Sequence, residues 1–327
     1  MYGNHRKMAI QLPSNFLVSR YTNNQLETHL TKLLSLSNIS EVSVKQYTTK
    51  ILQWLDYINV KKKNKILYNL VMLPEQSIKV LESMPTIKHT PQNHHIYISA
   101  VVALIKNVLM DTSTLFNPVF KKWKELQKKN WAPIQEHYDS NEPSAKQANM
   151  IVPFESLVQR IKELPVGSNE RLLLAFYTLI PPMRADYFAT QLFLQAPPNE
   201  PTEDNYIIMS EGRLVVKDFK TARKYEKIET ILPKELMDEL VASLRVQKPR
   251  RWLFVTAKNI CYSRSSFSHW ANRALSDIFN KPMNLTVLRH IYISHMIDAK
   301  TPTTEMKDIA KHMGHSRALQ RVYEWQK

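Results

Sequence analysis

The sequence is poor in cysteine and glycine and has no long apolar stretch. Cys261 is its single cysteine, which excludes an intrachain disulfide and a zinc site built from several cysteines and favours a reducing compartment. No segment approaches the ~18 consecutive apolar residues of a candidate membrane span, and the first residues lack the apolar core of a signal peptide. These absences predict a soluble intracellular protein that needs no membrane, with nucleus and cytoplasm both left open.

Acidic residues are outnumbered by basic ones. The chain carries 45 Lys and Arg against 29 Asp and Glu, which gives a formal net charge of +16 and a pI of about 9.7. This excess favours a polyanionic partner, and nucleic acid is the leading candidate. A single run of lysines is more often solvated surface than a contact. The runs that are candidates for binding DNA consist of Lys61, Lys62, Lys63, Lys121, Lys122 and Lys124.

The length of 327 residues allows two hydrophobic cores, and the pattern along the chain predicts two domains. Apolar residues recur at helical spacing from residue 24 to residue 107, which indicates a helical bundle. Residues 136–148 are polar and contain Pro143 and Ser144, a composition typical of a linker. The expected division is an N-terminal tail (1–20), a helical DNA-binding domain (21–135), a linker (136–149) and a catalytic domain (150–327).

The second domain mixes two periodicities. Short extended segments predict a small antiparallel β-sheet with a turn at Lys220; they are residues 206–209, 214–216 and 228–231, and residues 252–256 are a further strand candidate. Helical patterns surround them, at 153–161, near 172–179, after Pro233, and over 265–279, 285–297 and 304–313. The predicted fold class is therefore mainly α with a small antiparallel β-sheet.

The C-terminal segment contains an unusual cluster. Only four glycines occur in the chain, and Gly314 directly follows a helical pattern, so we expect it to end that helix in the left-handed conformation. Such a cap holds His315 in a tight turn. Tyr323 follows His315 by eight residues, close enough for a chain reversal to return it to the same pocket.

This cluster resembles the C-terminal signature of the tyrosine recombinase family, a Gly-His pair followed by the nucleophilic tyrosine. Upstream, residues 285–290 resemble the family box that carries its second arginine, here Arg289. Residues 181–187 resemble the box of the first arginine, here Arg184, in a version closer to recombinases of viral and eukaryotic mobile elements. Lys220 is similar to the family's hairpin lysine. The resemblance covers residues 150–327 by motif and residues 20–130 by helical pattern alone, and implies a helical core-binding domain followed by an α+β catalytic domain.

The resemblance also implies a role for each residue. Arg184 and Arg289 bind the non-bridging oxygens of the scissile phosphate, a task suited to the fork of a guanidinium. Tyr323 attacks the phosphate and becomes covalently attached to it. Lys220 protonates the leaving 5′-oxygen, and His315 either binds the phosphate or assists proton transfer. No metal or other cofactor is required, in agreement with the lack of a clustered set of acidic residues in the sequence.

The sequence departs from the family in several places. Thr286 stands three residues before Arg289, where the family has His or Lys, and a hydroxyl can donate a hydrogen bond but is no base near neutral pH. His290 and His312 are further auxiliary candidates. His312 and His315 are spaced like a metal pair, but the sequence positions no third ligand. Only four residues follow Tyr323, so the C-terminal helix that many relatives pass to a neighbouring protomer is either missing or truncated.

Taken alone, each of these residues is commoner as a surface or packing residue, and the order and spacing of the set carry the hypothesis. The resemblance that they carry implies a site-specific recombinase or integrase that cleaves and rejoins DNA through a covalent 3′-phosphotyrosine, for integration or excision of a viral or mobile element. Its expected partners are double-stranded recombination sites and further copies of itself, as a dimer and a synaptic tetramer. Two alternatives stay open, a type IB topoisomerase-like enzyme and a catalytically inactive DNA-binding protein.

Overall fold

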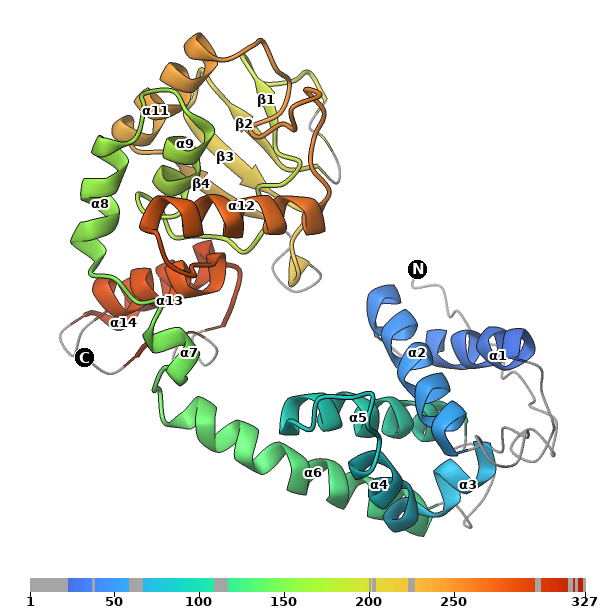
Figure 1. Cartoon of the computed structure of the whole chain (residues 1–327). Helices are drawn as coiled ribbons and strands as arrows, with labels where there is room; N and C mark the ends of the chain where they lie inside the picture. Colours follow the sequence, from blue (N-terminus) through green and yellow to red (C-terminus); the bar gives the residue numbers. More distant parts are fainter. Residues whose placement is uncertain are drawn as a thin grey trace. The chain divides into compact units, whose positions relative to one another are not determined.

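The computed structural model describes residues 23–36, 39–58, 67–108, 117–199, 201, 204–222, 227–297, 301–316, 320 and 323–325. The chain divides into two compact units, an N-terminal unit (Met1–His137) and a C-terminal unit (Tyr138–Lys327) (Figure 1). The predicted tail and the candidate lysines Lys61, Lys62 and Lys63 lie outside the described residues.

The N-terminal unit is helical, which confirms the interpretation of its apolar spacing. Its helices are α1 (Asn23–Ser35), α2 (Glu41–Ile58), α3 (Leu67–Met72), α4 (Pro74–Glu82), α5 (Pro91–Val108) and α6 (Asn117–Asp139). One apolar stripe of each longer helix faces a common core. Burial of that stripe stabilises a helix whose other face is polar.

Trp54 lies in that core and is fully buried. Its ring meets Tyr97 of α5 edge-on at 5.8 Å between centroids and Trp123 of α6 at 6.0 Å, the perpendicular geometry that aromatic quadrupoles prefer. The indole Nε1 of Trp123 donates to the carbonyl of Val71 at 2.7 Å, so its polar atom is satisfied inside the core. One aromatic group thus joins α2, α5, α6 and the end of α3.

The C-terminal unit contains a mixed four-stranded sheet in the order β1-β2-β3-β4. The strands are β1 (Gln191–Phe193), β2 (Tyr206–Ile208), β3 (Arg213–Val216) and β4 (Ile228–Ile231). The β2-β3 and β3-β4 pairs are antiparallel as predicted, but β1 runs parallel to β2. The purely antiparallel expectation was therefore wrong for this edge. The sequence analysis missed β1 because its residues, Gln191–Phe193, include no β-branched residue, whereas β2 of the same length consists of a tyrosine and two isoleucines.

The remaining sequence predictions for this unit are met to different degrees. The expected helices form as α8 (Phe154–Glu163), α9 (Asn169–Phe176), α11 (Lys234–Val246), α12 (Arg264–Phe279), α13 (Leu285–Met296) and α14 (Thr303–His312). Residues 252–256 make isolated bridges, one from Trp252 to Gln191, in place of the expected strand. The segment expected to be a linker contains the end of α6 and the short helix α7 (Ala145–Ala148), because Ser144 and Gln147 form a capping box.

The fold is therefore mainly α-helical with a small mixed sheet. Within the ranges that the structure describes, every helix is too short or too polar to cross a lipid bilayer.

The buried aromatic group predicts where the N-terminal unit is most sensitive. We expect Trp54→Ala to lower the free energy of unfolding of this unit by about 3–5 kcal/mol, the usual cost of replacing a buried aromatic residue by alanine. A urea titration of the full chain followed by circular dichroism measures it. Trp131→Ala is the matched control, since Trp131 is partly exposed on α6, and a change of similar size there would contradict the assignment.

Candidate active site

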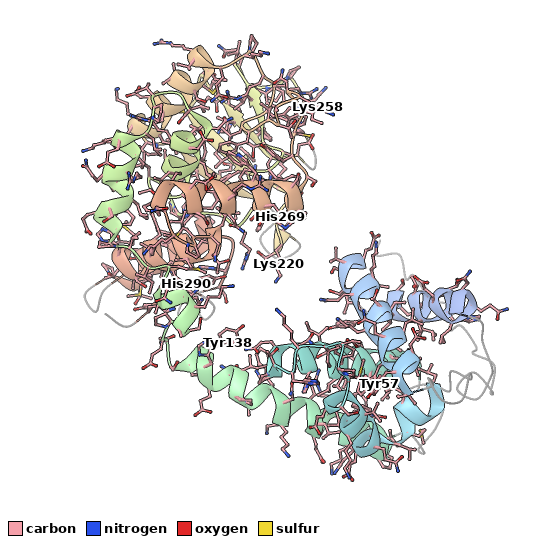
Figure 2. All side chains as sticks on the ribbon, viewed as in Figure 1. Tyr57, Tyr138, Lys220, Lys258, His269 and His290 are labelled. Atoms are coloured by element: carbon pink, nitrogen blue, oxygen red, sulfur yellow. The ribbon has the colours of Figure 1, made fainter. Side chains whose placement is uncertain are left out.

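Five segments of the C-terminal unit carry the candidate residues. Helix α13 holds Arg289 and His290, the turn after α14 holds Gly314 and His315, and Tyr323 lies near the C-terminus. The loop after α9 carries Arg184, and the turn after β3 carries Lys220. Figure 2 shows Lys220 on that turn and His290 on α13.

Arg289 is the centre of the cluster. It lies in the second turn of α13, whose N-terminus is capped by Asn284 through a 3.0 Å bond to the Val287 amide, and it is only 1% exposed. One terminal nitrogen, Nη1, donates to the carbonyl of Pro182. The other, Nη2, donates to His315 Nδ1 at 3.2 Å. A single buried guanidinium therefore joins α13, the loop of Arg184 and the turn of His315.

The turn that places His315 is a glycine helix cap, which confirms the prediction for Gly314. Gly314 has a φ of +66°, its amide bonds Lys311 O, and the His315 amide bonds Ala310 O, each at 3.0 Å. This is the Schellman pattern that satisfies the last carbonyls of a helix. A side chain at this position would also crowd Phe219, whose ring lies 3.1 Å from the place of a Cβ atom.

The same turn is tied to the segment of Lys220. Thr221 Oγ1 donates to the carbonyl of Gly314 at 2.6 Å. Because Lys220 and His315 are each adjacent in sequence to one partner of this bond, the two segments are held side by side. The Lys220 side chain itself is exposed.

The ring of Tyr323 packs inside this cluster. Its centroid lies 5.1 Å from the Arg289 Cζ atom, 5.4 Å from the stacked ring of His315 and 4.7 Å from the ring of His290. The chain reversal expected from the sequence therefore brings Tyr323 to the arginine and the histidine.

Helix α13 holds the segment of Tyr323 through contacts that the sequence did not reveal. His290 Nδ1 donates to the carbonyl of Tyr323 at 3.1 Å, and the His290 ring stacks on Trp325 at 4.0 Å between centroids. Ser294, one turn further along α13, accepts the Trp325 amide at 2.9 Å. We call these three contacts of His290 and Ser294 with the segment of Tyr323 the clamp. Its only signal in the sequence was the apolar residue two positions after Tyr323.

The arginines lower the pKa of the Tyr323 phenol below its ordinary value. Burial acts in the opposite direction, but the charges of Arg289 and Arg184 and the hydrogen bonds that both donate to the phenol oxygen outweigh it. The pKa shift favours the phenolate, which is the nucleophilic form of tyrosine.

The two histidines beside Tyr323 are neutral at physiological pH. Burial, together with the charges of Arg289 and Arg184, lowers the pKa of His315 to about 3, and burial lowers that of His290 to about 4. Because Arg289 donates to Nδ1 of His315, the ring proton of neutral His315 sits on Nε2. Among the described residues, His315 Nε2 and Arg289 Nε have no hydrogen-bond partner.

The other candidates lie in different places. Arg184 is anchored through its backbone, which accepts from the Tyr177 hydroxyl and donates to Asp186 Oδ2 at 3.2 Å. Thr286 is exposed on the first turn of α13, beside a pocket of about 340 Å³. His312 Nδ1 bonds the carbonyl of Asp308 in its own helix at 2.8 Å. In the described structure, Thr286 and His312 thus stay outside the cluster of Arg289, His315 and Tyr323.

The candidate lysines of α6 are surface residues. Lys121 is exposed, Lys122 pairs with Glu75 at 3.0 Å, and Lys124 donates to Gln127 at 2.8 Å. Within the described ranges, no group of three or more His, Cys, Asp or Glu side chains is arranged to hold a metal ion.

Comparison with known proteins finds a likeness among solved structures. No protein-family model and no curated protein sequence matches the chain. Among solved structures the chain is similar to XerA recombinase, over 94% of this chain and 95% of the other, with 15% sequence identity and a TM-score of 0.41. At that TM-score the likeness says nothing about activity or substrate.

The lowered pKa of His290 predicts an acid-sensitive clamp. In the unfolded chain His290 regains its ordinary pKa of 6.5, so the unfolded state binds the proton first, and stability is lost as pH falls from 6.5 towards about 4. We expect this loss to reach about 3 kcal/mol, from 1.36 kcal/mol per pKa unit.

The measurement compares wild type with His290→Gln, which cannot titrate in this range, by urea unfolding at pH 7 and pH 4. The difference in unfolding free energy between the two proteins should change by that amount between the two pH values. His269→Gln, at an exposed histidine of α12, should show no such change, and equal behaviour of the two variants would contradict the prediction.

Proposed function

We propose that this protein is a site-specific recombinase of the tyrosine type, which cuts and rejoins DNA through a covalent link to Tyr323. The observation that supports it best is the packing of Tyr323 against Arg289 and His315, with Arg184 as second donor to the phenol oxygen. Two arginines and a neutral histidine donor around one tyrosine match the needs of attack on a phosphodiester, whose charge grows on its non-bridging oxygens.

The cleavage step follows from these groups. The Tyr323 phenol releases its proton to solvent, helped by its lowered pKa, and its oxygen forms a bond to phosphorus. The bond from phosphorus to the 5′-oxygen breaks, and Lys220 supplies the proton that the leaving oxygen takes. Rejoining reverses each step, because the phosphotyrosine keeps the energy of the broken bond.

The family resemblance left His315 two roles, phosphate binding and proton transfer, and this proposal keeps only the first. With a pKa of about 3 it is neutral near pH 7 and a weak base. Its Nε2–H, which lacks a partner among the described residues, is suited to donate to a phosphate oxygen. Of the two roles left open by the sequence, the environment supports phosphate binding.

The ring of Tyr323 also separates two states of the site. It packs on Arg289 and His315, whose unpartnered nitrogens are buried. A scissile phosphate therefore reaches these donors only after the phenol has moved aside, and DNA binding exchanges phenol contacts for phosphate contacts.

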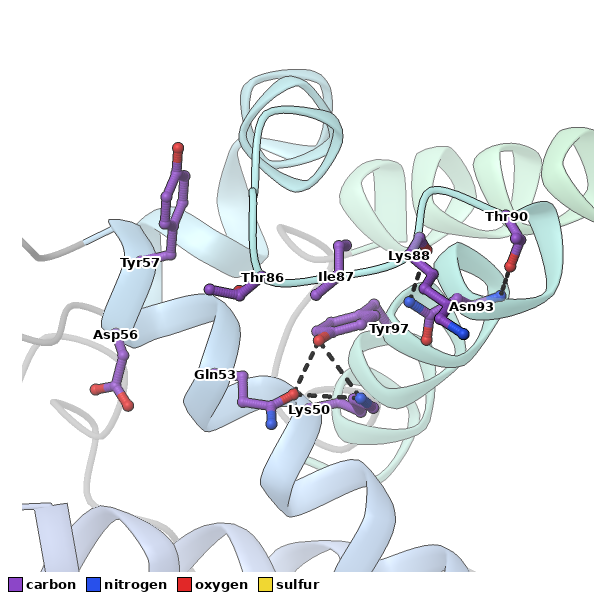
Figure 3. Close-up of a pocket in the computed structure, with 10 residues that line it drawn as sticks. All are labelled: Lys50, Gln53, Asp56, Tyr57, Thr86, Ile87, Lys88, Thr90, Asn93 and Tyr97. Atoms are coloured by element: carbon purple, nitrogen blue, oxygen red, sulfur yellow. Dashed lines mark hydrogen bonds between the residues drawn. The ribbon is translucent and has the colours of Figure 1, made fainter.

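The N-terminal unit offers a polar pocket for DNA, of about 730 Å³ and lined by residues of α2, α5 and the segment between α4 and α5 (Figure 3). Gln53 Oε1 accepts from Tyr97 at 2.9 Å and from Lys50 at 3.2 Å. Its oxygen is thereby engaged, which leaves the amide nitrogen to donate outward. Lys50 and Lys88 bring two positive charges against the one negative charge of Asp56, so the pocket suits phosphate and acceptor groups on bases.

The finer parts of the proposal rest on the motif resemblance and the basic charge. They are pairing on double-stranded recombination sites, assembly of dimers into a synaptic tetramer, and integration or excision of a viral or mobile element. Binding to DNA should weaken steeply with salt, since phosphate contacts release counterions.

Covalent capture tests the nucleophile. With a duplex nicked near the cleavage site, so that the cut strand diffuses away, wild type should accumulate an adduct that survives detergent, and Tyr323→Phe should form none. Tyr262→Phe is the matched control, since it removes a hydroxyl of the same unit and keeps the ring beside Trp270.

The same assay and a test for relaxation of supercoiled DNA together separate the alternatives. Absence of a wild-type adduct on DNA that the protein binds would leave the inactive DNA-binding protein as the better description. Relaxation of supercoiled DNA without any preferred site would favour the topoisomerase.

The pocket of the N-terminal unit predicts a second result. Lys50→Gln should weaken DNA binding about 10-fold at moderate salt and reduce the slope of log affinity against log salt by about 1, the effect of one lost phosphate contact. Fluorescence anisotropy over a salt series measures both. Lys79→Gln changes the same charge at an exposed position of α4 outside the pocket, and equal effects of the two substitutions would reject the pocket as a contact.

A further inference from the structure

Arg264 occupies an unfavourable place for a cation. It is the first residue of α12, next to the N-cap Ser263, and no acidic residue lies in the first turn. The N-terminus of a helix carries partial positive charge, so a cation there gains nothing from its own helix. Its contacts outside the helix must account for its position.

Those contacts join two segments that carry candidate catalytic residues. Arg264 Nη1 binds Asp186 Oδ1, and Nη2 lies 3.2 Å from Asp218 Oδ1. Asp186 follows Arg184 by two residues, and Asp218 precedes Lys220 by two. The guanidinium also lies over the ring of Phe188, at 4.9 Å from its centroid. One side chain thus bridges the loop of Arg184 and the turn of Lys220.

Asp186 transmits this contact to Arg184. Its carboxylate is 0% exposed, and its second oxygen, Oδ2, accepts the Arg184 amide at 3.2 Å. A buried carboxylate keeps its charge only when donors surround it. Without Arg264, Asp186 loses its charged partner, and its carboxylate is expected to shift towards solvent. The Arg184 backbone, which donates to the same carboxylate, is expected to shift with it.

A buried asparagine makes the same link through the backbone. Asn205 Nδ2 donates to the carbonyls of Asp186 at 2.8 Å and Asp218 at 3.1 Å. Its Oδ1 accepts the amides of Lys217 at 2.7 Å and Asp218 at 2.8 Å. The Arg184 loop and the Lys220 turn are therefore linked twice, by the side-chain amide of Asn205 and by the ion pairs of Arg264.

We infer that Arg264 is a positioning residue, which sets the phosphate-binding Arg184 and the proton-donating Lys220 in a fixed relation to each other. This inference rests on the proposed function for the roles of those two residues. The side chain of Arg264 is 40% exposed. Both its terminal nitrogens bind carboxylates, so in this inference its charge stabilises the protein and does not bind DNA.

Single-turnover cleavage of the nicked duplex tests the inference in the full-length protein. Arg264→Gln should slow adduct formation about 100-fold, the usual effect of misplacing catalytic groups by about 1 Å, while DNA affinity measured in the Tyr323→Phe background stays within about 2-fold. Arg264→Lys keeps the charge but can bind only one carboxylate well, so it should recover about 10-fold of the lost rate.

A modified leaving group separates the effect of Arg264 on Lys220 from its effect on Arg184. When sulfur replaces the bridging 5′-oxygen, the leaving thiolate needs no proton, so the defect of Lys220→Ala should disappear. The defect of Arg264→Gln should shrink but persist, because Arg184 is also displaced.

Hydrogen exchange tests the coupling without any reliance on activity. Arg264→Gln should speed amide exchange in residues 184–188 and in residues 217–219 together. Arg171→Gln is the matched control, since it breaks a bidentate pair with Glu239, 2.6 Å at each bond, in the same unit. It should lower the melting temperature, leaving both segments and the cleavage rate unchanged.

Three outcomes would overturn the inference: a wild-type rate for Arg264→Gln, a loss of DNA affinity as large as the loss of rate, or faster exchange in one segment alone. The hydrogen-exchange test remains valid even when neither the wild type nor any variant forms an adduct. That result would reject the proposed function, and the exchange data would still decide whether Arg264 couples the two segments.

Discussion

A guanidinium buried in a protein needs acceptors for its donors, and the two terminal nitrogens of Arg289 have theirs because distant segments are drawn together around them. Its partners are a backbone carbonyl of the Arg184 loop and the ring of His315, and the ring of Tyr323 packs on its face. Burial of a charge costs several kcal/mol unless it is paired. The rest of the site is arranged around this demand, including the left-handed Gly314 that turns His315 towards the arginine.

The same charge sets the chemistry of its neighbours. It helps to keep His315 neutral and lowers the pKa of the Tyr323 phenol, so one residue is made a hydrogen-bond donor and the other a better nucleophile. The hydrogen bonds from His290 and Ser294 hold the segment of Tyr323 by its backbone. These bonds engage the main chain of the segment, while the Tyr323 ring makes its own contacts with Arg289 and His315.

Around this centre, side-chain contacts link the segments to one another. Arg264 with Asp186 and Asp218 links the Arg184 loop to the Lys220 turn, and Thr221 links the Lys220 turn to Gly314. These bonds close a ring of contacts from Arg184 through Lys220 to His315 and back through Arg289. Arg184, Lys220 and His315 thus come from separate segments yet share one framework, which is the kind of preorganisation that the proposed catalysis requires.

Much of the fold and of the candidate site could be predicted from the sequence, because these features depend on local pattern. Helical spacing predicted the N-terminal bundle, Gly314 after a helix predicted its cap, and the short spacing of His315 and Tyr323 predicted that they meet; the motif resemblance added Arg289 to that cluster. The parallel edge strand β1 left no local signal. Only the tertiary structure decided that Thr286 and His312 lie apart from that cluster, that His315 is a neutral donor, and that Arg264 joins two candidate segments. Burial and contacts between residues far apart in the chain decide these features, since pKa values and the pairing of buried charges depend on what surrounds a group in space.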